Sequence, residues 1–70
     1  MEFEFIDSSH LTGAFYDETS ATLYLQFKGG TIYEYYDVPD YVYHELMAAD
    51  SKGTYANENI YKNYKQQKIG

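Results

Sequence analysis

The chain has no cysteine, a single proline, and only five basic residues, all of them lysine. The absence of cysteine excludes a disulfide framework and thiolate metal sites. No apolar run approaches the ~20 residues that span a bilayer. Glu2 and Glu4 place acid where a secretory signal needs basic charge. We therefore expect a cytoplasmic protein that does not contact a membrane.

Aromatic residues are abundant, with 10 tyrosines and 4 phenylalanines among 70 residues. Tyrosine favours strands and combines an apolar body with a polar tip, so it suits the rim of a small core. A chain of this length forms one domain and buries only roughly 60% of its unfolded surface. The composition therefore predicts a single folded domain over residues 1–70 and argues against disorder.

The net charge of −6 is unevenly distributed along the chain. Residues 1–50 contain ten acidic residues and one lysine, whereas residues 51–70 contain one acidic residue and four lysines. A net acidic surface repels phosphate at long range, so the charge opposes RNA binding. Any RNA contact would have to use the C-terminal end, while the acidic part suits a protein partner with a basic surface.

Alternating apolar and polar residues predict the strands. Residues 2–5 alternate acidic and aromatic side chains as in a strand. Further strands are expected over residues 11–17, 22–27 and 31–36, and Gly13 in the first of these indicates a bulge.

The glycine pair Gly29-Gly30 marks a hairpin, and its register can be argued. A two-residue loop would place Leu25 opposite Glu34 and put a carboxylate in the core. A three-residue loop that includes the preceding lysine instead pairs Leu25 with Tyr33 and puts Gly30 at the left-handed position of the turn. We predict the second register, because a one-residue slip reverses every side chain.

Two helices should follow the strands. Pro39 is typical of a helix start, with Asp37 or Val38 as its cap, and this helix should end near Asp50. A turn over residues 52–53 should precede a shorter helix capped by Thr54.

This order predicts an α+β fold, in which a three-stranded antiparallel meander is followed by two helices (β-β-β-α-α) packed on one sheet face. The core should extend over about residues 6–64, with residues 65–70 as a frayed tail.

Across residues 6–64 the chain resembles the KTSC domain family, a short module named for its place at the C-terminus of some lysyl-tRNA synthetases and also found as stand-alone proteins of bacteria and phages. The residues that carry the resemblance are, in order, Ser8-Ser9, Leu11, Tyr16-Asp17, Leu23, Leu25, Phe27, Gly30, Tyr33-Glu34-Tyr35, Val38-Pro39, Val42-Tyr43, Leu46, Ala49, Ser51, Gly53, Asn57, Ile60 and Tyr64.

The resemblance implies a small interaction module, not an enzyme. RNA binding is implied only by the family's association with a tRNA synthetase. The chain departs from the pattern at Phe15, where the family usually has glycine. It also departs at Ala56 and Tyr61, where an aromatic and often a basic residue are common, and this weakens the RNA interpretation.

The predicted register places Tyr24, Ile32 and Tyr36 on the sheet face opposite the core, flanked by Gln26 and Glu34. An uncovered aromatic patch of this kind marks contact sites. The three residues are therefore our candidate surface for a protein partner or a homo-oligomer. Coverage by the N-terminal segment and an ordinary solvated face are the alternatives.

Basic and aromatic residues gather near the C-terminus, where Tyr61, Lys62, Tyr64 and Lys65 form the alternative RNA- or nucleotide-binding site. A basic helix end that complements the helix dipole is the competing explanation. His10 and His44 have no third residue at recognisable spacing, so we predict no catalytic residue, metal site or cofactor.

Overall fold

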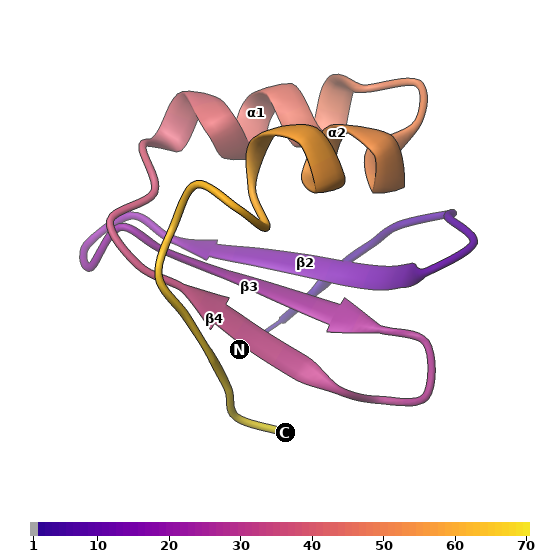
Figure 1. The fold of residues 1–70 in the computed structure, drawn as a ribbon, viewed down its shortest axis with the longest axis horizontal. Coiled ribbons are helices and arrows are strands. Elements are labelled where there is room, and N and C mark those ends of the chain that lie inside the picture. The colour runs from indigo at the N-terminus through magenta and orange to yellow at the C-terminus, as the bar shows by residue number, and fades with distance from the viewer. Residues whose placement is uncertain (1) are drawn as a thin grey trace.

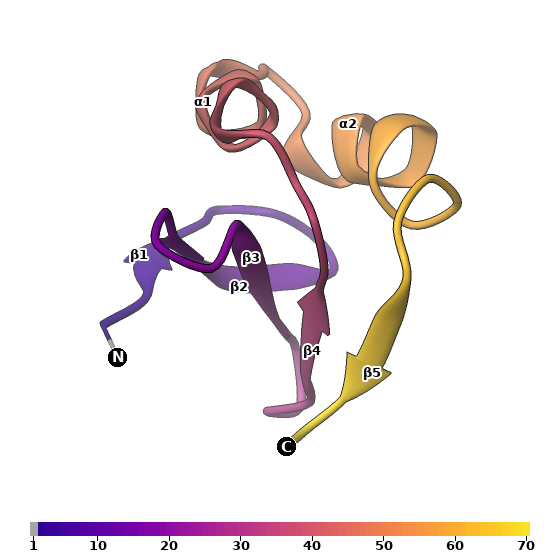
Figure 2. The ribbon, with the colours of Figure 1, turned by 90° about the vertical axis from the view of Figure 1, so that its left-hand side faces the viewer.

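The computed structural model describes residues 2–70 as a five-stranded antiparallel sheet with two helices on one face (Figures 1 and 2). The strands lie side by side in chain order, β1-β2-β3-β4-β5. The elements are β1 (Glu4–Phe5), β2 (Leu11–Asp17), β3 (Thr22–Phe27), β4 (Ile32–Tyr35), α1 (Asp40–Ala48), α2 (Lys52–Asn59) and β5 (Gln66–Lys68).

The hairpin between β3 and β4 has the predicted register, since Leu25 pairs with Tyr33. Gly29 and Gly30 have φ angles of 93° and 95°, which disfavour a side chain. The amide of Gly30 donates a hydrogen bond to the carbonyl of Phe27 at 3.0 Å, which closes the turn. The prediction of the turn was confirmed, and with it the assignment of every side chain on β3 and β4 to a face.

The sheet has two more strands than the predicted three-stranded meander, and this is a correction. β1 pairs with β2, and β5 pairs with the outer edge of β4. Residues 65–70 were expected to be frayed, but the amide of Ile69 donates to the carbonyl of Ile32 at 2.8 Å and that of Tyr36 donates to Lys65 at 3.0 Å. The polar sequence of β5 has no apolar alternation, so backbone pairing alone makes it a strand.

The predicted bulge is present in β2, where the pairing with β3 shifts between Leu11 and Gly13. A Cβ at position 13 would lie only 3.0 Å from the Cβ of Phe3. Gly13 therefore lets the N-terminal segment lie close against β2.

The helix starts differ from the predicted ones. Pro39 itself occupies the cap position of α1, because Asp37 has a left-handed φ of 57° and turns the chain before it. The second helix starts three residues earlier than predicted, since Ser51, not Thr54, caps it: the Ser51 hydroxyl accepts a hydrogen bond from the Thr54 amide at 3.3 Å. Gly53 consequently lies in the first helical turn instead of a loop.

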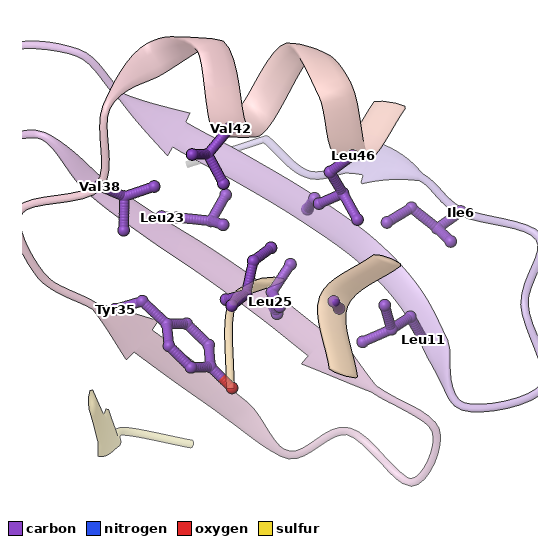
Figure 3. Packing of buried hydrophobic residues seen from close by; sticks show 11 residues of the cluster. Ile6, Leu11, Leu23, Leu25, Tyr35, Val38, Val42 and Leu46 are labelled. Atoms are coloured by element: carbon purple, nitrogen blue, oxygen red, sulfur yellow. The ribbon is translucent and has the colours of Figure 1, made fainter. Parts of the chain in front are cut away.

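The core lies between the sheet and the helices (Figure 3). Leu23, Leu25 and Tyr35 rise from β3 and β4 toward the helices, and Val42 and Leu46 descend from α1. The full set of buried hydrophobic residues is Ile6, Leu11, Ala14, Leu23, Leu25, Tyr35, Val38, Val42, Leu46, Ala56 and Ile60.

The loop before α1 is held to the sheet by Tyr16, whose hydroxyl donates to the carbonyl of Val38 at 2.6 Å. The Tyr16 ring also stacks on Tyr43 of α1, with ring centroids 5.6 Å apart. One side chain of β2 therefore fixes both the start and the face of the first helix. Within residues 2–70, no helix is long and apolar enough to cross a membrane.

Candidate functional site

The sheet face opposite the helices is not covered by either helix (Figure 2). Aromatic side chains from three adjacent strands form a row on it, which we call the open-face row: Phe3, Phe5, Phe15 and Tyr24. The rings of Phe3 and Phe15 are 6.4 Å apart, and those of Phe15 and Tyr24 are 5.8 Å apart. Edge-tilted contacts at these distances hold the rings in a fixed arrangement.

The N-terminal segment extends this face instead of covering it, because β1 lies beside β2 at the edge of the sheet. Phe5 pairs with Gly13 and therefore lies on the same face of the sheet as Phe15, and 77% of Phe5 is exposed. Phe15 lies on this surface as well, although it was not among the residues predicted for it. Its place opposite Tyr24 could have been found by extending the predicted alternation by one strand.

The predicted residues Tyr24, Ile32 and Tyr36 all lie on this face and are half-buried. The Tyr36 hydroxyl donates to the Glu34 carboxylate at 2.7 Å, and the side-chain oxygen of Gln67 lies 3.1 Å from it. The hydrogen bond to Glu34 raises the pKa of Tyr36, whereas burial and then the Glu34 charge raise the pKa of Tyr24.

Gly70 lies against Ile32, because a Cβ on it would be 3.4 Å from the Ile32 side chain. The C-terminal strand therefore occupies one end of the predicted surface. Tyr24 lies in the open-face row, while Ile32 and Tyr36 form a more polar border beside β5.

The basic-aromatic residues near the C-terminus are divided between surface and interior. Lys62 and Lys65 are exposed, whereas Tyr61 and Tyr64 pack partly against the core. The Tyr61 ring stacks on Tyr35 with centroids 6.2 Å apart, and burial raises the pKa of its hydroxyl.

Four aromatic rings close into a loop on the helix side of the sheet, which we call the aromatic box: Phe27, Tyr33, Tyr35 and Tyr61. Successive centroids around the loop are 5.8, 6.4, 6.2 and 5.9 Å apart. With Gln66 of β5, these rings line a cavity of about 390 Å³. The sequence patterns did not indicate this box, since Tyr61 reaches it from beyond α2.

A second cavity, of about 560 Å³, is polar and lies where the β1–β2 connection meets the start of α2. Ser8 approaches α2 closely at Gly53, because a Cβ there would lie 3.2 Å from the Ser8 hydroxyl. The residues that line it are Asp7, Ser8, Ser9, His10, Asp50, Ser51, Lys52, Gly53, Thr54, Asn57 and Tyr61. Several polar residues that carry the family resemblance therefore meet at one place.

The polar cavity offers hydrogen-bonding groups, and some of them are engaged within the protein. Ser8 accepts a hydrogen bond from the amide of His10, and Ser51 caps α2. Lys52 donates to the carbonyl of Ala49 at 2.9 Å. Among residues 2–70, no group of three or more His, Cys, Asp or Glu side chains could hold a metal ion.

Known proteins with similar sequences and a similar fold identify the family of this domain. Residues 7–64 match the model of the KTSC domain. A protein from Tsukamurella paurometabola is 42% identical over 52 residues, which cover 74% of this chain and 78% of that protein. A lysine–tRNA ligase from a Nostoc species is 43% identical over 54 residues, 77% of this chain but 10% of the ligase.

The solved structure of a KTSC domain protein from Yersinia pestis superposes with a TM-score of 0.92 at 30% identity, and covers 99% of this chain and 97% of that protein. The family match, the relatives and the superposition agree, and the chain belongs to the KTSC domain family.

Proposed function

We propose that this chain is a small, non-enzymatic interaction module that binds a protein partner through the open face of its sheet. The observation that carries the proposal is the open-face row, in which four aromatic side chains lie on the face that neither helix covers. Aromatic residues are enriched at protein interfaces because they supply a large contact area at a low cost in side-chain entropy.

Charge on the same face indicates what kind of partner would fit. Glu34 lies beside Tyr24, and the chain as a whole carries a net charge of −6. A partner that offers an apolar patch bordered by lysine or arginine would be attracted at long range and would pair with this border. A second copy of the acidic chain would be repelled, so a different protein is favoured over self-association.

The proposal is tested with two exposed aromatic residues on opposite layers. Phe5 belongs to the open-face row, and Tyr41 is exposed on α1 with 58% of its surface free. Immobilised wild type, Phe5→Ser and Tyr41→Ser would be used to capture proteins from the native host, followed by quantitative mass spectrometry.

We expect a protein retained by wild type and Tyr41→Ser to be lost at least tenfold with Phe5→Ser. Equal retention by both variants would contradict the proposal. Light scattering measures the molar mass of the three proteins and tests for a homo-oligomer. A dimer that only Phe5→Ser disrupts would show that the partner is a second copy of this chain.

A second candidate is RNA or nucleotide binding at the C-terminal end, at Tyr61, Lys62, Tyr64 and Lys65. The specific observation in its favour is that four of the five lysines are exposed, and that one of them, Lys68, pairs with Tyr33 of the aromatic box. Its affinity should fall steeply as salt screens the phosphate contacts. Anisotropy of a labelled single-stranded oligonucleotide at low and high salt measures this, and a salt-independent signal would count against it.

A further inference from the structure

The aromatic box has the size and lining of a site for a flat ring. Its cavity of about 390 Å³ is shallow and mostly open to solvent, so a flat ligand would reach it from outside. Three of its rings, Phe27, Tyr33 and Tyr61, are only partly buried. Their π faces are therefore reachable, and stacking between ring faces does not require one particular heterocycle.

A nearly buried tyrosine lines this cavity, since Tyr35 is 1% exposed and belongs to its wall. Figure 3 shows the Tyr35 hydroxyl pointing away from Val38. A tyrosine hydroxyl can donate and accept a hydrogen bond, so Tyr35 adds a polar group to a largely aromatic lining.

One lysine lies on the same side of the sheet as the box. Lys68 pairs with Tyr33 across β4 and β5, which places both side chains on one face of the sheet. Lys68 is exposed, while Lys52 is engaged with the carbonyl of Ala49. An exposed cation on the side of the aromatic rings favours an anionic ligand.

From this juxtaposition we propose that the aromatic box binds the base of a nucleotide, with the base stacked on the exposed ring faces and its phosphate held by Lys68. The Tyr35 hydroxyl supplies a hydrogen bond to a polar edge of the base. The inference deepens the second candidate function, on which it rests, and adds Phe27, Tyr33 and Tyr35 to the residues predicted from the sequence. A free organic cation, which an aromatic cage would otherwise attract, is disfavoured by the positive charge of Lys68.

Isotope-labelled full-length protein would be titrated with adenosine 5′-monophosphate, adenosine, a single-stranded adenine hexanucleotide and tetramethylammonium chloride. We expect the monophosphate to shift the NMR signals of Phe27, Tyr33 and Gln66 but not those of Tyr24, and to bind at least threefold more tightly than adenosine. Two outcomes identify the source of the base. If the affinity for the hexanucleotide is far higher than six independent bases would give, the natural ligand is a nucleic-acid strand. If the affinity per base equals that of the monophosphate, it is the free nucleotide.

Variants locate the site independently of the signal shifts. Tyr33→Leu and Tyr61→Leu should each weaken monophosphate binding about tenfold, since stacking on one ring contributes about 1–3 kcal/mol per base. Tyr24→Leu removes a half-buried tyrosine from the other sheet face and should leave affinity unchanged. Lys68→Gln should weaken binding about threefold, whereas Lys52→Gln should not. Circular dichroism shows whether each variant is folded. If a variant is not folded, the NMR signal shifts of the wild-type protein still decide whether the box binds the monophosphate.

The inference and the second candidate function fail in different ways. Binding of the hexanucleotide with shifts away from the box, and with full affinity in Tyr33→Leu and Tyr61→Leu, would overturn the box and leave nucleic-acid binding in place. Absence of binding by both nucleotides at millimolar concentration would overturn both. Shifts in the box caused by tetramethylammonium and not by the monophosphate would also overturn the assignment to a nucleotide.

Discussion

The two faces of the sheet are built from the same strands and from similar residues, yet their side chains are buried to different extents. On the face under the helices, Leu23, Leu25 and Tyr35 are almost completely buried. On the open face, the alternating positions Tyr24, Ile32 and Tyr36 are only half-buried. The residue type does not separate these sets, because a tyrosine occurs in both. What separates them is which side the helices cover.

This difference separates the face that stabilises the fold from the face that is available for binding a partner. Apolar area on the covered face is removed from water by the chain itself, which is the main source of folding free energy in a small domain. The open-face row keeps part of its area in water, and a partner could bury it. A change on the covered face should therefore affect folding, and a change on the open face should affect binding with less effect on folding.

The largest expected effect compares two neighbours on β3. Leu25→Ala should lower the free energy of unfolding by about 2–5 kcal/mol, because it leaves a cavity in the core. Tyr24→Ala, one residue earlier on the other face, should cost about 1 kcal/mol, mainly its ring contact with Phe15. Urea unfolding of both variants measures the difference. Equal losses would show that the open face is as structural as the covered one.

A smaller effect compares two tyrosine hydroxyls. Tyr16→Phe should cost about 1 kcal/mol or more, because it leaves the Val38 carbonyl without its donor at the start of α1. Tyr36→Phe on the open face should cost less than about 0.5 kcal/mol, since water can replace the bond to Glu34. Thermal unfolding monitored by circular dichroism gives both values. If the order is reversed, the open-face hydrogen bonds contribute more to folding than their exposure implies.

The smallest effect extends the comparison to the helix layer, where the Tyr55 hydroxyl of α2 donates to Glu45 of α1 at 2.7 Å. Burial and this hydrogen bond raise the pKa of Tyr55 to about 12 from the unfolded value of 10.0. A raised folded pKa contributes stability that is complete below pH 10 and lost as the pH rises toward 12.

Because Tyr55 is only partly buried, we expect the contribution to be small. The difference in urea midpoint between wild type and Tyr55→Phe should therefore narrow between about pH 10 and about pH 12, because Tyr55 ionises in the unfolded chain before it ionises in the folded one. A constant difference over this range would mean that the hydrogen bond does not link the two helices.

The central hairpin was predictable because its signals are local. Gly29 and Gly30 mark the turn, and the need to keep Glu34 out of the core selects one register. The helix starts were less accurate, since Ser51 and Thr54 are both good caps and only the path of the chain selects between them. β5 was missed because Gln66–Lys68 has no apolar alternation.

The candidate sites divide in the same way. Tyr24 on the open face followed from the register alone, while Phe15 joined it only through the pairing of β2 with β3. The aromatic box could not be predicted, because it brings together residues from β3, β4 and the segment after α2. Sequence patterns place a side chain on a face of its own element, but they do not report which distant element packs there.

The sequence by itself determined the α+β class, the hairpin register and the face of each residue on β3 and β4, because these depend on periodicity and on the conformational freedom of glycine. Only the tertiary structure decided that two polar or short segments close the sheet edges, and that Tyr61 meets Phe27 and Tyr35. Those outcomes depend on backbone pairing and packing between segments far apart in the chain, for which local sequence carries no signal.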